Sequence, residues 1–149
     1  MATQWTAGTT SGQVLTAATL NTIGAAWVDY TPTLTQSATV TKTINNARYC
    51  QIQKTVFVQV YLIATSAGTA GNIVKIGLPI AARTANSSTT GIGQIYDAST
   101  NVIYVVSAYL TDVNSCAFLY QTGNPYGISP AITLAASDQL QMNLTYEVA

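Results

Sequence analysis

The stretch that decides the fold is residues 55–65, Thr-Val-Phe-Val-Gln-Val-Tyr-Leu-Ile-Ala-Thr. Its side chains fall into two alternating sets, with Val56, Val58, Val60 and Leu62 in one and Phe57, Gln59, Tyr61 and Ile63 in the other. A period of two is the spacing of a β-strand, in which successive side chains point to opposite faces of the sheet. Because both sets are largely apolar, we expect a strand that is covered on both faces.

Strand patterns continue on both sides of this stretch. Residues 38–44 alternate, Asn45 and Asn46 predict a tight turn, and residues 48–52 form a second strand before a turn at Gln53 and Lys54. Later strands are expected at 73–78, 91–96, 102–110, 115–121 and 139–147, with Asp97, Asp112 and Asp138 in or beside turns. About eight short strands with turns at regular intervals predict an all-β fold, an antiparallel β-sandwich that is jelly-roll-like.

The N-terminal segment has a different character. Residues 8–12 make a polar Gly, Thr and Ser link, and residues 13–24 predict a short helix that Thr16 caps and Gly24 ends. Leu20 and Ile23 lie three apart on one face of it, and so short a helix needs a docking partner. We therefore divide the chain into an N-terminal attachment arm with a short helix, residues 1–26, and a β-sandwich domain, residues 27–149.

The composition is poor in charge. Charged residues make up 7% of the chain, against about 25% in ordinary soluble domains, and five basic residues balance five acidic ones. This balance argues against nucleic acid as a partner, because its phosphates require clustered Lys and Arg. The longest apolar stretch, residues 102–110, falls short of the about 20 residues that cross a bilayer. Residues 1–5 lack a basic head and hydrophobic run, so we expect no signal peptide and no membrane partner.

A search for chemistry finds little. The chain has no histidine, which excludes Ser-His-Asp and Cys-His arrangements and removes the commonest zinc ligand. Gly91 and Gly93 do not complete a phosphate-binding motif, and a bulge or close backbone approach is the better interpretation. Cys50 and Cys116 have no metal-site spacing; free thiols are favoured and a disulfide stays open. We expect no catalytic residue, no cofactor and no metal site, and hence no enzyme.

Three stretches resemble a family of tailed-bacteriophage virion surface proteins, which are capsid decoration, minor tail or tail-fibre-like proteins. They are residues 7–21 (AGTTSGQVLTAATLN); residues 27–34 (WVDYTPTL) with 47–49 (ARY) and 53–58 (QKTVFV); and residues 136–140 (ASDQL) with 144–147 (LTYE). Two residues depart from the pattern. Gln53 replaces a glycine, which puts the turn type in doubt, and Thr19 replaces an acidic residue near the helix start.

The resemblance implies a β-sandwich head, commonly trimeric, carried by an N-terminal attachment segment. We therefore expect a non-enzymatic structural protein of the virion, assembled in the host cytoplasm, that works as a capsid decoration or cement protein. Its partners would be sister copies in a homotrimer and the major capsid protein or a tail or baseplate protein. The alternative is a short tail fibre or receptor-binding tip that meets a host surface glycan, and an outsider is a carbohydrate-binding module.

Two groups of residues are candidates for contact. The first is predicted for virion attachment or an interface and comprises Trp5, Leu15, Leu20, Ile23, Trp27 and Tyr30. For Trp27 and Tyr30 we leave open the alternative that they only plug the bottom of the sandwich. The second is an exposed contact loop at residues 123–128, in which Asn124 and Tyr126 are expected to face solvent.

Overall fold

The computed structural model describes residues 26–84, 89–121 and 123–149, and all of its regular elements there are strands. They are β1 (Val28–Asp29), β2 (Leu34–Gln36), β3 (Ala38–Thr39), β4 (Lys42–Ile52), β5 (Thr55–Ala64), β6 (Val74–Gly77), β7 (Thr89–Asp97), β8 (Val102–Asp112), β9 (Ser115–Tyr120), β10 (Asn124–Pro125) and β11 (Gln139–Glu147). Neighbouring strands pair antiparallel throughout. The prediction of an all-β, antiparallel fold is confirmed.

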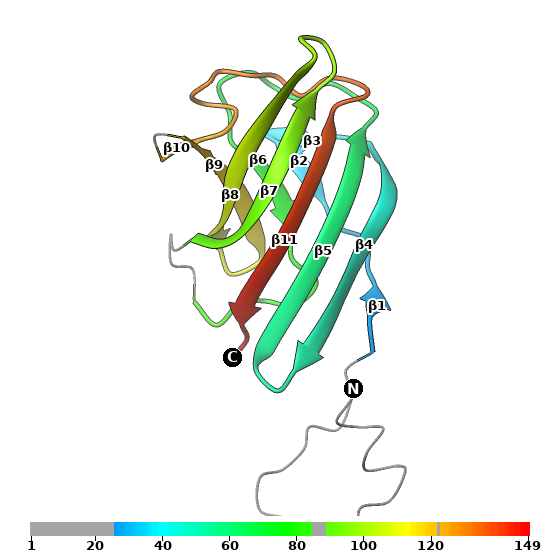
Figure 1. The fold of residues 1–149 in the computed structure, drawn as a ribbon, viewed down its shortest axis with the longest axis vertical. Helices are drawn as coiled ribbons and strands as arrows, with labels where there is room; N and C mark the ends of the chain where they lie inside the picture. Colours follow the sequence, from blue (N-terminus) through cyan, green and yellow to red (C-terminus); the bar gives the residue numbers. More distant parts are fainter. Residues whose placement is uncertain (1–25, 85–88, 122) are drawn as a thin grey trace, which may run out of the picture.

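The strands belong to one hydrogen-bonded path that curls around the core. Its order is β1-β4-β5-β11-β7-β8-β9-β6-β2-β3, and β10 pairs with β9 off this path. Strands β4, β5, β11, β7 and β8 form a broad front layer, and β9, β6, β2 and β3 lie behind it (Figure 1). The hydrogen bonding therefore gives one curled sheet rather than the two separate sheets of a sandwich.

The core lies between the front and back parts of the curl. One alternating set of β5, Val56, Val58, Val60 and Leu62, is buried as the period of two predicts. Residues from the other strands complete it, among them Leu34, Ile76, Phe118, Leu140 and Leu144. The second set of β5 points away from the core, and Phe57 in it keeps 37% of its surface exposed. The expected cover on that side is not found within the described part of the chain.

The predicted tight turn at Asn45 and Asn46 is wrong. Strand β4 continues through both residues, and the pairing with β5 shifts register between Ile44 and Asn46. Asn45 is the extra residue of this bulge, and a bulge, like a turn, leaves one residue out of the regular pairing. The turn at Gln53 is present, and Gln53 adopts a φ of 53°. This left-handed conformation is one that glycine adopts more readily than other residues, and the turn forms here although its residue is glutamine.

Gly91 and Gly93 mark a close approach between two strands. The pairing of β7 with β8 shifts register between Thr89 and Gly91. A Cβ atom on Gly91 would lie 2.0 Å from the Asn143 carbonyl oxygen, and one on Gly93 would lie 2.3 Å from that of Gln141. The interpretation as a bulge and close approach is confirmed. It lets β7 lie tightly against β11 in the middle of the front layer.

The predicted arm, residues 1–26, falls almost wholly outside the described residues, and so does its helix at 13–24. Strand β1 begins at Val28 and pairs with β4 at the edge of the front layer. Among the described residues no helix is long and apolar enough to cross a membrane.

Candidate functional site

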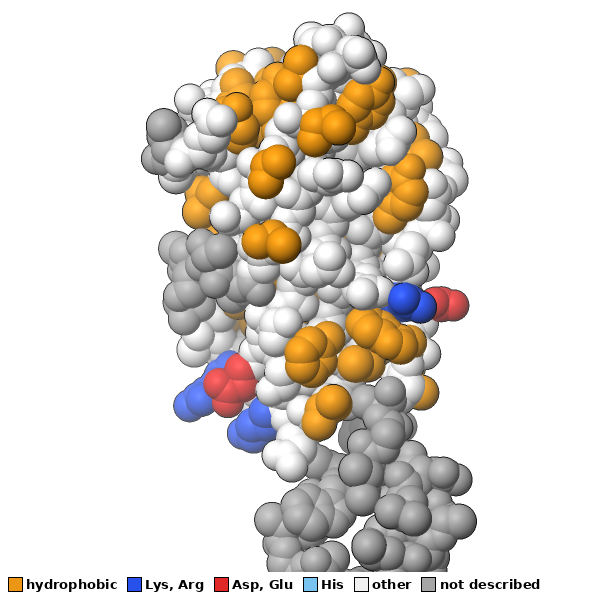
Figure 2. Space-filling view, viewed as in Figure 1, with side chains coloured by type: hydrophobic (Ala, Val, Ile, Leu, Met, Phe, Trp, Pro, Cys, Tyr) orange, Lys and Arg blue, Asp and Glu red, His pale blue; other side chains and the backbone are white. Residues whose placement is uncertain are grey.

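The candidate site is the outward surface of the front layer, which we call the outer face. It consists of side chains on five neighbouring strands: Arg48 of β4; Phe57, Gln59, Tyr61 and Ile63 of β5; Gln139, Gln141, Asn143 and Thr145 of β11; Ile92, Gln94 and Tyr96 of β7; and Ile103, Val105 and Ser107 of β8. Arg48 is the one charged residue among these side chains, and Glu147, opposite Thr55 at the end of β11, continues the same outward set. Figure 2 shows apolar groups separated by uncharged polar surface, with the visible charges near the margins.

An aliphatic patch occupies the β7–β8 side of the outer face. Ile92, Ile103 and Val105 keep 68%, 58% and 73% of their surface exposed. They come from paired strands, in which Val105 lies opposite Gln94 and Ser107 lies opposite Ile92. A shallow depression of about 550 Å³ runs from this patch to Leu119 and Tyr120 of β9. β-branched residues this exposed on regular strands form an unusual solvent surface.

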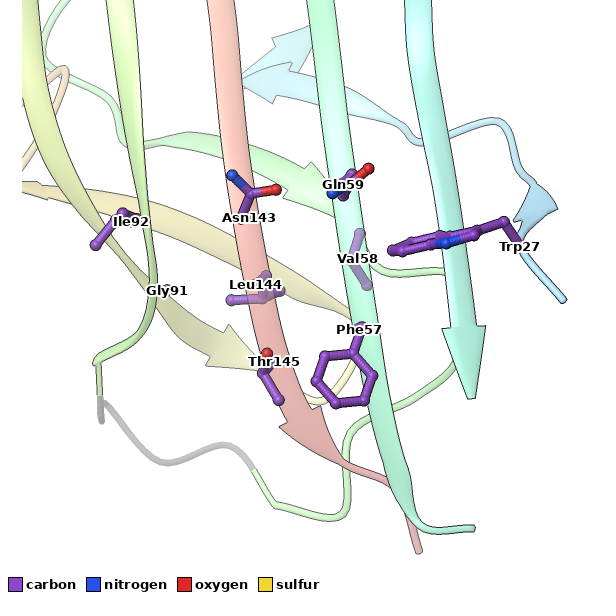
Figure 3. A pocket seen from close by; sticks show the side chains of 9 residues that line it. All are labelled: Trp27, Phe57, Val58, Gln59, Gly91, Ile92, Asn143, Leu144 and Thr145. Atoms are coloured by element: carbon purple, nitrogen blue, oxygen red, sulfur yellow. The ribbon is translucent and has the colours of Figure 1, made fainter. Parts of the chain in front are cut away.

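An aromatic groove lies closer to the β1 edge of the same face. It is a shallow depression of about 330 Å³, and its side chains are Trp27, Phe57, Gln59, Ile92, Asn143 and Thr145. Two cross-strand pairs form its floor, because Thr145 lies opposite Phe57 and Asn143 lies opposite Gln59. Trp27 reaches from the β1 edge across β4 toward β5 (Figure 3). The groove therefore combines two aromatic rings with amide and hydroxyl groups.

Arg48 fixes the positions of two groove residues. Its guanidinium carbon lies 4.8 Å from the centre of the Trp27 ring, in cation–π contact. Its Nε and one terminal nitrogen donate hydrogen bonds to Gln59 Oε1 at 3.0 and 2.8 Å. These bonds turn the carbonyl side of the Gln59 amide toward Arg48, so that the amide nitrogen is left for another acceptor. One guanidinium thus orients a ring and an amide together.

This arrangement is suited to binding by stacking, hydrogen bonding and apolar contact. Comparison with known proteins adds no further guide. No family model, curated protein or solved structure matches the chain. The function is therefore inferred from the chemistry of the outer face together with the sequence.

The predicted attachment residues separate into three groups. Trp5, Leu15, Leu20 and Ile23 lie outside the described residues. Trp27 is 42% exposed and belongs to the aromatic groove, so it does not plug the core. Tyr30 packs against the core and meets Tyr49 edge to face with ring centres 6.0 Å apart, which is the plug alternative.

The predicted exposure of Tyr126 is wrong. The residue is fully buried, and its ring packs against Tyr104 with centres 5.3 Å apart. Strand β10 pairs with β9, and the Tyr126 backbone donates a hydrogen bond to the Phe118 carbonyl at 2.8 Å. Because β10 brings the chain back toward the core, the ring of Tyr126 is buried there, and burial of its apolar surface is favourable. Asn124, one residue before Pro125, is exposed as expected.

The turn roles of three aspartates are confirmed. Asp97 Oδ1 accepts hydrogen bonds from the backbone of Ser99 and Thr100, and Asp112 Oδ1 accepts one from Asn114. Asp138 accepts from Ala98 and Ala135, and so ties two loops together. Burial opposes ionisation of Asp97 and Asp112, yet hydrogen bonds lower the pKa of both. For Asp138 burial prevails, and its pKa is raised.

The two cysteines are free and buried, which agrees with the favoured expectation and not with a disulfide. Burial raises the pKa of the Cys116 thiol to about 12. Within the described ranges, no group of three or more His, Cys, Asp and Glu side chains could hold a metal ion. Among the described residues two surface ion pairs form, Lys75 with Asp112 and Arg83 with Glu147, and none of these four residues lines the groove.

Sequence reasoning missed most of the groove. Phe57 and Gln59 stood in the outward set of β5, but that set was expected to be covered. Asn143 and Thr145 carry no local signal, because an amide and a hydroxyl in a strand are ordinary solvent-facing residues. Only the pairing of β5 with β11 places them beside Phe57 and Gln59. A search for uncharged polar residues opposite outward aromatics would have found the site once the strand order was known.

Proposed function

We propose that this protein is a non-catalytic structural protein of a tailed-phage particle, a capsid decoration or cement protein that acts as a symmetric oligomer. A trimer is the form that the family resemblance suggests. Its function is to bind sister copies and the particle through its uncharged surface.

The observation that carries this proposal is the aliphatic patch of Ile92, Ile103 and Val105. These three side chains line one shallow depression, and exposed apolar surface gathered in one place commonly marks a protein–protein contact. Val and Ile lose little conformational freedom on burial, since branching at Cβ already restricts χ1. The lack of charge around the patch removes the desolvation penalty that charged groups would add. A stable contact buries about 1,200–2,000 Å² in total, so the patch would be the centre of a larger interface.

We also propose that the fold is a jelly-roll-like sandwich. The front and back parts of the curled sheet lie on opposite sides of one core, as the two layers of a sandwich do, although one path of hydrogen bonds joins them. The order of the three sequence stretches along the chain supports the same family.

Particle composition tests this proposal. Quantitative mass spectrometry of purified particles should find the chain at a copy number close to that of the major capsid protein. Light scattering on the full chain should give a mass that is a small multiple of 15.6 kDa. Absence of the chain from particles would contradict the proposal, and so would a monomer at every concentration.

A short tail fibre or receptor-binding tip is the second candidate, and the aromatic groove is the observation that favours it. A groove that combines aromatic rings with amides offers the contacts that a small ligand uses, and a purely cementing protein does not require such a groove. A copy number close to that of the tail proteins would select this candidate over decoration. The third candidate, a free carbohydrate-binding module, would bind sugar as a monomer that is not incorporated into particles.

A further inference from the structure

We propose that the aromatic groove binds an uncharged glycan. Trp27 and Phe57 would lie against the apolar faces of sugar rings, and the amides of Gln59 and Asn143 would hydrogen-bond to hydroxyl groups. The proposal goes beyond a structural role, and it concerns the aromatic groove, which shares Ile92 with the aliphatic patch but includes neither Ile103 nor Val105.

The strand register places these groups within reach of one small ligand. Residues directly opposite each other in an antiparallel pair have Cβ atoms about 4.5–5.5 Å apart. The pair of Gln59 and Asn143 therefore sets two amides side by side, and the adjacent pair on the same face sets Phe57 beside Thr145. Trp27 extends toward these pairs from the β1 edge of the sheet (Figure 3). Rings and polar groups thus lie in neighbouring rows on one rigid surface.

The polar groups of the groove have hydrogen-bonding capacity to spare. Gln59 Oε1 is occupied by Arg48, which leaves the Gln59 amide nitrogen as a donor. The exposed side chains of Asn143 and Thr145 form no hydrogen bond with the described part of the chain. Asn offers both a donor and an acceptor, and a Thr hydroxyl does the same. Sugar hydroxyls need both kinds of partner.

The charge of the groove selects a neutral ligand. Its lining has no acidic or basic side chain, and the nearby Arg48 is already engaged by Gln59 and by the Trp27 ring. An anionic ligand would have to compete with these contacts for a single cation. The volume of about 330 Å³ is at the lower end of the range of small-molecule sites, about 300–1,000 Å³. A short segment of a neutral oligosaccharide matches both the size and the mixture of apolar and hydroxyl surface.

Calorimetric titration of the full chain tests the proposal. The probes are the neutral hexasaccharides cellohexaose, maltohexaose, mannohexaose and N-acetylchitohexaose, with a sulfated oligosaccharide as the charged comparison. We expect saturable binding of at least one neutral probe and no tighter binding of the sulfated one. Trp27→Ala and Asn143→Ala should each weaken binding by at least about tenfold, and circular dichroism should show that both variants are folded.

Val105→Ala is the matched control, since it removes an exposed side chain of the same face outside the groove, and it should leave the affinity unchanged. The proposal is overturned if no neutral probe binds at millimolar concentration, or if both groove variants bind like the parent. A third outcome would also overturn it: no probe binds, and Trp27→Ala dissociates the oligomer and so lowers its mass in solution. That outcome would show that the groove is filled by a second copy of the chain. None of these results depends on the number of copies in the particle, which is the measurement that tests the structural proposal. The two proposals can therefore fail independently.

Discussion

Gln36 holds Leu134 through a buried hydrogen bond between positions far apart in the chain. The Leu134 backbone N–H donates to Gln36 Oε1 at 2.9 Å, and Gln36 Nε2 donates to the carbonyls of Ile132 and Asn72 at 2.7 and 3.1 Å. The side chain is fully buried, so these bonds satisfy an amide that could not otherwise leave water. One residue of β2 thereby secures two loops that have no strand of their own.

Gln36→Ala should destabilise the protein by about 3 kcal/mol, because it leaves a cavity and deprives buried backbone groups of their partners. The free energy of unfolding from urea denaturation measures this. Gln94→Ala is the control, since Gln94 is exposed and hydrogen-bonds only to Gln141 among the bonds described. Its cost should stay within about 0.5 kcal/mol. Equal costs for the two variants would contradict the structural role of Gln36.

Gly68→Ala should weaken the same connection from the other side. A Cβ atom on Gly68 would lie 2.1 Å from Gln36 Oε1, so the amide would have to move. Overpacking of this kind costs about 1–3 kcal/mol. In the double variant Gln36→Ala/Gly68→Ala, the Gln36 Oε1 atom that the new Cβ would meet is absent. The double variant should therefore lose less free energy of unfolding than the sum of the losses in the two single variants. Gly71→Asn is the control, because nothing lies within 4 Å of a Cβ there and Asn tolerates positive φ.

The longer strands of this fold were predictable because their signal is local, whereas the short strands β1, β2 and β10 were not predicted. The alternation in residues 55–65 gave β5 and its buried set, and the turn-forming aspartates were placed correctly beside their strands. The bulge at Asn45 was mistaken for a turn because the same residue types favour both. Only the continued pairing of β4 with β5 on either side distinguishes them.

The groove and the buried Tyr126 depend on contacts that the sequence does not encode locally. Tyr126 follows Pro125 and precedes Gly127, which is a pattern typical of an exposed loop. Its burial results from the pairing of β10 with β9, and the buried Gln36 likewise carries no local signal that sets it apart from an exposed polar residue. In both cases a long-range backbone contact decides whether a side chain faces water or the core.

Asp97 and Asp138 should give the stability opposite dependences on pH. The pKa of Asp97 is lowered in the folded protein, so its stabilising contribution is present above the unfolded value near 3.8 and is lost as the pH falls through the folded value. The pKa of Asp138 is raised, so its contribution is present below that unfolded value and is lost as the pH rises through the folded one. Asp97→Asn should therefore flatten the acid side of the stability profile.

Asp138→Asn serves as the comparison for this pair. It removes one hydrogen-bond acceptor at a constant cost, but relative to the parent its stability should improve as the pH rises from about 3 to 7. Urea denaturation at a series of pH values gives both profiles. Parallel profiles for the two variants would contradict the opposite pKa shifts.

Cys116 should be unreactive in the folded protein. With a pKa of about 12, about one thiol in ten thousand is ionised at pH 8, and the side chain is also buried. In a Cys50→Ser variant, which leaves Cys116 as the single thiol, a disulfide reagent should react in guanidinium but not under native conditions. Native reaction at the rate of the unfolded chain would show that the strands around Cys116 open readily.

Val105→Lys should dissociate the proposed oligomer without unfolding the subunit. The side chain is 73% exposed on β8, so a lysine there costs little in the isolated fold, but it would bring identical charges together or bury them wherever copies pack through the aliphatic patch. Light scattering should give a mass close to 15.6 kDa for the variant at a concentration at which the parent is oligomeric.

Val113→Lys is the matched control, because Val113 is 37% exposed in the turn between β8 and β9 and lies outside the patch. It should keep the mass of the parent. If Val105→Lys keeps that mass as well while Val113→Lys loses it, copies meet at the β8–β9 turn, and the patch must be covered by something other than this chain.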